Sequence, residues 1–212
     1  MDKEILTNPF TPPSRIISTH DPVTGRAIFS DISEKPPIGC SSCSVTGSEP
    51  SRNVRLYSTS TFPVSGLSPP SDVTAEENAN HDLKDYLYDL EHPSPPNGSN
   101  LSHTSCRIFE MPPGDEGLMH RTISFDYGVV LDGAVEWELD SGEKRVLRKG
   151  DVSIQRGTAH AWKNVTPTEE NNGWARMFFV ILSSERITIK GGRQLEHGFG
   201  LPRLADSAKS PH

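Results

Sequence analysis

Short segments of alternating polar and apolar residues, separated by glycine, fill the chain from Cys106 onward. Such alternation is typical of strands that bury one face. The expected strands span residues 106–111, 124–131, 134–139, 144–147, 152–155, 161–165, 175–182 and 186–190. Glycines stand between them at Gly114, Gly133, Gly142, Gly150 and Gly157. Regular short strands with glycine turns predict an all-β fold, an antiparallel sandwich or barrel, and the lack of an internal repeat predicts a single one.

The first hundred residues are less regular. Residues 14–30 predict a hairpin around a turn that contains Pro22 and Gly25, and residues 53–60 alternate as a strand does. Residues 74–91 predict the one helix, because three leucines fall on one face and a proline follows. The stretch between residues 33 and 52 is polar and rich in proline, glycine and serine, so we expect a loop there.

These patterns divide the chain into three parts. Residues 1–104 are expected to form an N-terminal extension of hairpin strands, loops and one helix that packs on the barrel. Residues 105–190 are expected to form the barrel core, and residues 191–212 a C-terminal tail.

Charge and hydropathy narrow the functional classes. The 212 residues carry a formal net charge of -7, and the isoelectric point is about 5.6. This is the wrong sign for a protein that binds a nucleic-acid backbone. No run approaches the roughly 18 apolar residues that a membrane span requires, and the start of the chain lacks the features of a secretory signal. We therefore expect a cytoplasmic protein that acts on small molecules.

Three cysteines do not form a disulfide framework in such a protein. Cys40 and Cys43 have the spacing of a redox pair or of half a zinc site. They lie in a loop-like run, and the only other cysteine is Cys106. The favoured interpretation is a loop with incidental thiols, without redox or zinc function.

One spacing pattern surrounds the first histidine of the strand region. Five residues separate Gly114 from His120, one separates His120 from Thr122, three separate Thr122 from Asp126, and six separate Asp126 from Gly133. This pattern resembles the first motif of the cupin superfamily, in which two histidines and a glutamate lie between two glycines. Thr122 stands in place of the second histidine and Asp126 in place of the glutamate.

A second pattern follows at the usual distance. Gly157, His160 and Asn164 match the second cupin motif, with Gln155 where a proline is expected and one residue fewer after Gly150. The joint resemblance implies a single antiparallel, jelly-roll-like barrel of the single-domain, cupin type 2 kind. It does not imply an activity, because one fold supports many chemistries.

The resemblance also implies a metal site. In cupins the matching positions converge on one ion in the barrel, which here makes His120, Asp126 and His160 the implied ligands. The set is incomplete because threonine replaces a histidine at position 122. Two imidazoles and one carboxylate could still hold divalent iron, zinc or manganese.

The same three residues could work without a metal. A carboxylate beside an imidazole raises its basicity, and a pair of histidines can supply an acid and a base near neutral pH. We therefore consider His120, Asp126 and His160 as catalytic candidates with or without an ion. The alternative is a structural role, in which they are polar residues of the barrel wall with satisfied hydrogen bonds.

Neighbouring side chains are candidates for substrate contact. They are Thr122, Gln155, Arg121, Tyr127 and Trp162. For Trp162, packing against the outer layer is the better interpretation. The expected barrel core consists of Phe125, Val129, Leu131, Val135, Phe178 and Val180.

Around its two histidine motifs, and in its N-terminal hairpin, the chain resembles single-domain cupins of fungal and bacterial small-molecule biosynthesis. This implies a tailoring enzyme that acts on a polyketide-like intermediate, with lyase or isomerase chemistry (dehydration, cyclisation or decarboxylation). A non-haem iron oxidoreductase and a non-catalytic ligand-binding protein are the alternatives. The strands expected within residues 14–30 and 53–60 could pair across a two-fold axis, so we expect a homodimer with no nucleic-acid or membrane partner.

Overall fold

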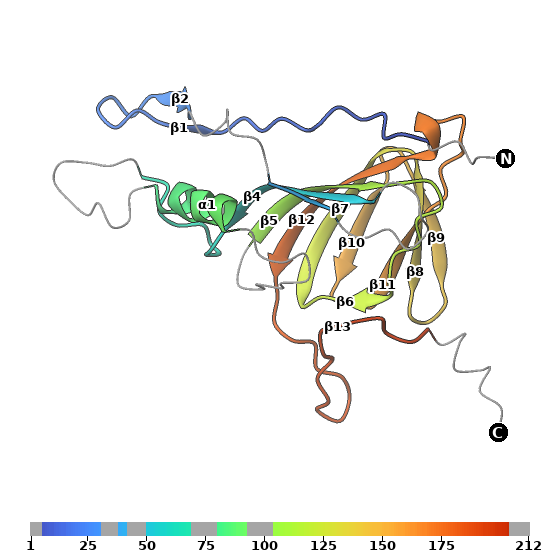
Figure 1. Ribbon diagram of the computed structural model, residues 1–212. Helices are drawn as coiled ribbons and strands as arrows, with labels where there is room; N and C mark the ends of the chain where they lie inside the picture. The colour runs from blue at the N-terminus through green and yellow to red at the C-terminus, as the bar shows by residue number, and fades with distance from the viewer. Residues whose placement is uncertain (1–5, 31–37, 42–49, 69–79, 93–103, 204–212) are drawn as a thin grey trace, which may run out of the picture.

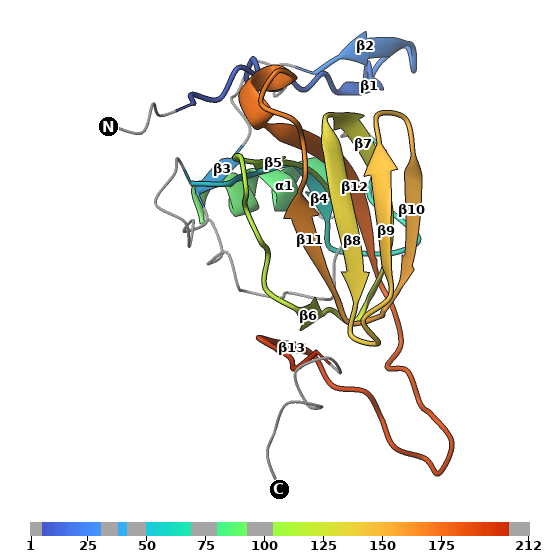
Figure 2. The same cartoon turned by 90° about the vertical axis from the view of Figure 1, so that its right-hand side faces the viewer.

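Two antiparallel sheets face each other in the computed structural model (Figure 1), and Figure 2 shows them from the side of β8, β9 and β11. The structure describes residues 6–30, 38–41, 50–68, 80–92 and 104–203. The six-stranded sheet has the order β10 (Val152–Arg156), β7 (Ser124–Asp132), β12 (Ala175–Ser183), β5 (Thr104–Met111), β4 (Arg52–Thr59) and β3 (Ile38–Ser41). The five-stranded sheet has the order β13 (Gly198–Phe199), β6 (His120–Arg121), β11 (His160–Asn164), β8 (Ala134–Leu139) and β9 (Lys144–Arg148). The predicted antiparallel β-fold is confirmed.

The inward faces of the two sheets meet in one apolar cluster. Its members come from both sheets and are Met111, Val130, Val135, Leu147, Trp162, Ala175 and Met177, with Phe109, Trp137 and Phe179 packed against them. We call the space between these inward faces the lumen. Side chains alternate along a strand, so each strand turns every second residue toward the lumen.

This alternation corrects most of the predicted core. On β7 the buried residues are Ser124, Asp126, Gly128 and Val130. Phe125, Val129 and Leu131 lie on the opposite, outer face, and Phe178 lies beside Val129 there. Val180 pairs with Tyr127 on the same outer face, whereas Val135 is fully buried in the lumen cluster. The prediction failed because both faces of these strands carry apolar residues.

Several boundaries differ from the expected ones. β3 lies within the segment expected to be a loop, and β13 lies within the segment expected to be a tail. Residues 186–190 form no strand, only an isolated bridge between Thr188 and Gln194. These short pairings depend on which backbone lies alongside, so alternation along the chain does not reveal them.

The helix packs against β4 of the six-stranded sheet. α1 (His81–Glu91) buries Leu83 and Tyr86, and the Tyr86 ring lies 4.5 Å from that of Tyr57 on β4. Tyr57 Oη donates a hydrogen bond to Asp82 Oδ2 at 2.7 Å. The expected helix began at residue 74, but residues 69–79 lie outside those described. No helix in the described part of the chain is long and apolar enough to cross a membrane.

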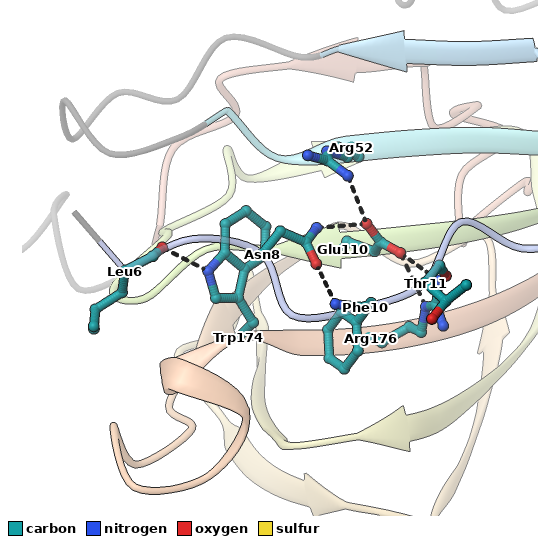
Figure 3. A network of polar contacts seen from close by, with 8 residues as sticks. All are labelled: Leu6, Asn8, Phe10, Thr11, Arg52, Glu110, Trp174 and Arg176. Carbon is teal, nitrogen blue, oxygen red and sulfur yellow. Dashed lines mark hydrogen bonds and ion pairs between the residues drawn. The ribbon is translucent and has the colours of Figure 1, made fainter.

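The N-terminal segment is tied to the outer face of the six-stranded sheet at β5 and β12, as Figure 3 shows. Trp174 Nε1 donates to the Leu6 carbonyl at 3.0 Å, and Arg176 Nη2 donates to the Thr11 carbonyl at 2.7 Å. Asn8 Nδ2 donates to Glu110 at 2.7 Å. The segment then continues into the predicted hairpin, β1 (Ser18–His20) and β2 (Ala27–Phe29), which forms a small sheet of its own.

Candidate functional site in the lumen

Two histidines meet on neighbouring strands of the five-stranded sheet. His120 on β6 and His160 on β11 are paired in register, and their ring centroids lie 4.3 Å apart at an interplanar angle of 51°. His120 Nδ1 donates to the Leu118 carbonyl at 2.9 Å, and His160 Nδ1 donates to the Thr158 carbonyl at 3.1 Å. A carbonyl oxygen only accepts, so Nδ1 carries the proton in each ring. Each neutral ring therefore keeps a lone pair on Nε2.

Burial keeps both imidazoles uncharged at neutral pH. Desolvation, with a smaller effect from the nearby His120, lowers the pKa of His160 to about 3, while the hydrogen bond to Thr158 opposes the shift. Desolvation is also the main cause that lowers the pKa of His120, with a smaller effect from His197, while the hydrogen bond to Leu118 opposes it. Two neutral rings thus present two acceptor nitrogens at one place in the barrel.

Asp126 lies on the facing sheet, on the inward face of β7. It is 8% exposed, and Gln155 Nε2 donates to its Oδ2 at 3.1 Å. Within the described residues, its other oxygen, Oδ1, is buried without a hydrogen-bond partner. Burial raises the pKa of Asp126 to about 6, against a hydrogen bond from Ser124 and the charge of Arg107. Near neutral pH this carboxyl group can therefore gain or lose a proton.

We expected Asp126 to lie beside an imidazole, but in the structure Asp126 and the two histidines have other hydrogen-bond partners. Backbone carbonyls hold the Nδ1 atoms of both histidines, while Gln155, 2% exposed, holds Asp126. Gln155 and Asp126 are direct cross-strand partners of β10 and β7. Gln155 faces the lumen as expected, but its hydrogen bond there positions a carboxylate.

An aromatic row continues from the histidine pair along the inward face of the five-stranded sheet. Trp162 lies edge-on to His160, with ring centroids 5.8 Å apart. It stacks on Trp137 at 5.3 Å and 17°, and Phe179 of the facing sheet lies 5.8 Å away. Trp162 therefore packs inside the lumen, and the interpretation that it packs against the outer layer is wrong. Alternation explains the placement, because Trp162 lies two residues after His160.

Three other candidates lie away from this row. Thr122 shares a hydrogen bond of 2.7 Å with the hydroxyl of Ser124. Arg121 Nη2 donates to Asp140 Oδ2 at 3.3 Å. Tyr127 is 44% exposed and lies on the outer face of β7. The alternation that turns Asp126 inward therefore turns Tyr127 away from the lumen.

Sequence reasoning missed the contribution of β13. Phe199 pairs in register with His120 and stacks on its ring at 5.4 Å and 14°. His197 packs edge-on against Phe199 at 5.2 Å, and no residue in the described ranges pairs with its buried Nδ1. The one local signal was a histidine and a phenylalanine, two residues apart, in a segment otherwise typical of a tail.

The donor set bears directly on the metal that the resemblance implies. In the ranges described, no three side chains of His, Cys, Asp or Glu lie close enough together to hold an ion. The two Nε2 atoms are suitable donors, but Asp126 belongs to the facing sheet and is held by Gln155. In this arrangement the three residues do not fit a shared three-ligand site. Metal binding by His120, Asp126 and His160 stays a prediction that elemental analysis has to test.

Comparisons with known proteins place the chain in a family. The model of the family described as Cupin domain matches residues 107–170. Phomopsin biosynthesis cluster protein C' of Diaporthe leptostromiformis is 39% identical over 180 residues, which cover 84% of this chain and 82% of that protein. Phomopsin biosynthesis cluster protein D of the same organism is 40% identical over 183 residues, covering 84% and 82%. Cupin-domain-containing oxidoreductase fogC of Aspergillus ruber is 38% identical over 136 residues, covering 64% and 58%. The chain belongs to the cupin family.

Proposed function

We propose that this cupin is a tailoring enzyme of secondary metabolism that moves a proton within a carbonyl-containing, polyketide-like intermediate. The names of two relatives, which refer to phomopsin biosynthesis clusters, support the metabolic setting. The lumen supports the chemistry, because it holds two uncharged imidazoles and a carboxyl group with a pKa near neutrality. Lyase or isomerase chemistry needs one group that takes a proton and one that returns it.

The residues divide these tasks by their protonation. His120 Nε2 accepts a proton from a substrate carbon that is conjugated with the carbonyl group, because its Nδ1 already holds its own proton against Leu118. Asp126, in its protonated fraction, donates to a leaving hydroxyl, and water departs. Return of the proton to a different carbon gives isomerisation instead. His160 keeps its lone pair and accepts a hydrogen bond from the substrate or from protonated His120.

The observation that carries this proposal is the histidine pair with both Nδ1 atoms held by backbone carbonyls. The experiment starts from a strain of the producing host that lacks the gene, in which the unprocessed intermediate should accumulate. Complementation with His120→Ala or His160→Ala should leave the intermediate unprocessed. His20→Ala is the matched control, because His20 is exposed on β1, and it should restore the product. If both lumen variants restore the product, the proposal is wrong.

The name of one relative favours a second candidate. The Aspergillus ruber protein is called an oxidoreductase, and two adjacent Nε2 donors suit divalent iron, zinc or manganese. A bound divalent iron would supply redox chemistry. Elemental analysis of the purified protein separates the candidates. Bound metal that is lost in His120→Ala and His160→Ala, and that approaches one ion per chain in Thr122→His, favours the oxidoreductase. Turnover that persists after metal removal favours proton transfer.

A further inference from the structure

Two buried polar atoms of the lumen lack a hydrogen-bond partner within the described residues, namely Asp126 Oδ1 and Trp137 Nε1. A buried donor or acceptor without a partner destabilises the folded state, so native proteins pair nearly all of them. The two atoms differ in kind. Trp137 Nε1 only donates, whereas the carboxylate of Asp126 accepts. A ligand that satisfies both must therefore offer one acceptor and one donor.

Both atoms are held in place by their neighbours. Trp137 is fixed by its stack on Trp162 and by its position as the cross-strand partner of that residue. Asp126 is fixed by the hydrogen bond from Gln155 to its other oxygen. Neither side chain has to move to meet a ligand. A preorganised pair of this kind loses little conformational freedom on binding.

The wall between Trp137 and the proposed catalytic histidines is aromatic. The rings of Trp137, Trp162 and His160 follow one another at 5.3 Å and 5.8 Å. Trp137 and Phe179 face the lumen but stay only partly buried. Such surfaces interact best with flat π-systems, by offset stacking or edge-to-face contact. A saturated, puckered molecule makes fewer of these contacts.

We infer that the lumen takes a flat, conjugated carbonyl compound that also carries a hydroxyl group. Its carbonyl oxygen accepts a hydrogen bond from Trp137 Nε1, and its plane lies against the aromatic row. Its hydroxyl donates to Oδ1 of ionised Asp126, whereas the protonated fraction of Asp126 donates to this hydroxyl when it leaves. This assignment rests on the proposed function and adds the substrate class to it. Trp137 is then a specificity-determining residue, because it touches the carbonyl end of the substrate.

Binding of simple probes to the wild-type protein tests the class without any turnover. The probe is para-hydroxyacetophenone, which is flat and carries both polar groups. Acetophenone lacks the hydroxyl group, para-ethylphenol lacks the carbonyl, and cyclohexyl methyl ketone lacks both the hydroxyl group and the flat ring. Calorimetry should show binding of para-hydroxyacetophenone in the millimolar range or tighter, as expected for a ligand of about ten heavy atoms. Each probe that lacks one polar group should bind about threefold to tenfold more weakly.

Two variants assign the contacts to their residues. Trp137→Phe keeps a flat ring but removes the N–H group, so it should weaken para-hydroxyacetophenone about threefold to tenfold and leave para-ethylphenol unchanged. Asp126→Asn should weaken the hydroxyl-bearing probes and leave acetophenone unchanged. Tyr88→Phe is the control, because it removes one hydroxyl from an exposed ring on α1. Thermal melts check that each variant is folded.

The outcomes separate this inference from the proposed function. No binding of para-hydroxyacetophenone to the wild type, equal binding of cyclohexyl methyl ketone, or equal losses for probes with and without the carbonyl in Trp137→Phe would each overturn the substrate class. These binding measurements do not depend on whether the histidines are catalytic. If instead the probes behave as expected while His120→Ala restores the product in the host, the substrate class stands and the proposed chemistry fails.

Discussion

Two buried carboxylates lie on strands of the same sheet, Glu110 on β5 and Asp126 on β7, with β12 between them, and they have different surroundings. Glu110 lies on the outer face of β5 and is 2% exposed. It accepts hydrogen bonds from Arg176 Nε at 3.0 Å and Nη2 at 2.6 Å, and from Asn8, while Arg52 lies 4.0 Å away (Figure 3). Asp126 lies on the inner face of β7 and accepts a hydrogen bond from Gln155, with a further contribution from Ser124. Its Oδ1 is buried without a hydrogen-bond partner among the described residues.

The two carboxylates differ in the groups that compensate their negative charge. Glu110 is compensated within the chain by cations and an amide, and these contacts attach the N-terminal segment to the sheet. Asp126 is compensated only in part, and burial raises its pKa to about 6. A fully paired charge contributes to structure, whereas a partly paired one beside titratable groups is a candidate for chemistry. The predictions below test this contrast.

The largest expected effect is on turnover in the lumen. His120→Ala and His160→Ala should each lower the rate about a hundredfold to ten-thousandfold, the usual loss for a missing acid or base. Each should change the free energy of unfolding by only about 1 kcal/mol, because one hydrogen bond to a backbone carbonyl is lost. Initial rates with the intermediate isolated from the deletion strain, together with urea titrations, measure both quantities. If the variants lose stability but keep the wild-type rate per folded molecule, the histidines are structural residues, as Glu110 is.

The next effect is on stability at the outer face. Glu110→Ala should lower the free energy of unfolding by about 3–5 kcal/mol, because it leaves the Arg176 guanidinium without its carboxylate. Urea titration followed by circular dichroism measures it. Glu116→Ala is the control, since Glu116 pairs with Lys163 at an exposed site and should cost less than about 1 kcal/mol. Equal costs for the two variants would contradict the assigned role of Glu110.

A smaller effect depends on pH and belongs to Asp126. Its pKa in the folded state is about 6, above the usual 3.8. The folded state therefore binds the proton more tightly, and this contribution to stability is present below about pH 4 and lost as pH rises to about 6. Asp126→Asn should thus be more stable than the wild type by about 1–3 kcal/mol above pH 6, and this advantage should vanish near pH 3.

The comparison is made by urea titration of both proteins across this range. Both carry His120 and His160, so the histidine contributions cancel in the difference, and Arg107 and Gln155 face position 126 in both proteins. A stability difference that does not change with pH would show that the Asp126 carboxyl is not shifted.

The last prediction concerns association into the expected homodimer, whose loss should change the single chain least. The expected interface used residues 14–30 and 53–60, but β4 is already paired on both edges, with β3 and β5. The exposed apolar residues that remain for an interface include Ile28 and Phe29 on β2 and Tyr127, Val152 and Ile154 on the outer face of β7 and β10. Light scattering should give about twice the chain mass of 23.3 kDa. The double variant Val152→Asp, Ile154→Asp should give the single mass. Val146→Asp, at an exposed site on β9, should keep the dimer. A wild-type mass of 23.3 kDa contradicts the homodimer.

Much of the fold follows from local pattern. Alternation and glycine turns predicted the strands that became β5, β7, β8, β9, β10, β11 and β12, with boundaries within one or two residues. Gly133 is an example of the cause. It has φ of +79° at the turn between β7 and β8, and a Cβ there would lie 2.9 Å from the backbone oxygen of Trp174. Only glycine is free of both constraints.

Part of the candidate site could also be predicted from local sequence pattern. Motif spacing singled out His120, His160, Asp126 and Gln155, and the structure turns all four toward the lumen. The sequence could not pair Asp126 with Gln155, since 29 residues separate them along the chain. Nor could it bring Phe199 and His197 to His120, because the two-residue strand β13 exists only through its pairing with β6.

By itself, then, the sequence determined the all-β class, the strand order along the chain, and the titratable residues that form the candidate site. Strand periodicity and motif spacing are local properties, and they need no knowledge of neighbours. Only the tertiary structure decided which alternate residues face inward, as the outward positions of Phe125, Val129 and Tyr127 show. An alternating pattern has a period of two residues but no marked inner face when both faces are apolar. The inner face is set by the sheet that packs against it, and in this protein that choice placed Asp126 and Trp162 in the lumen.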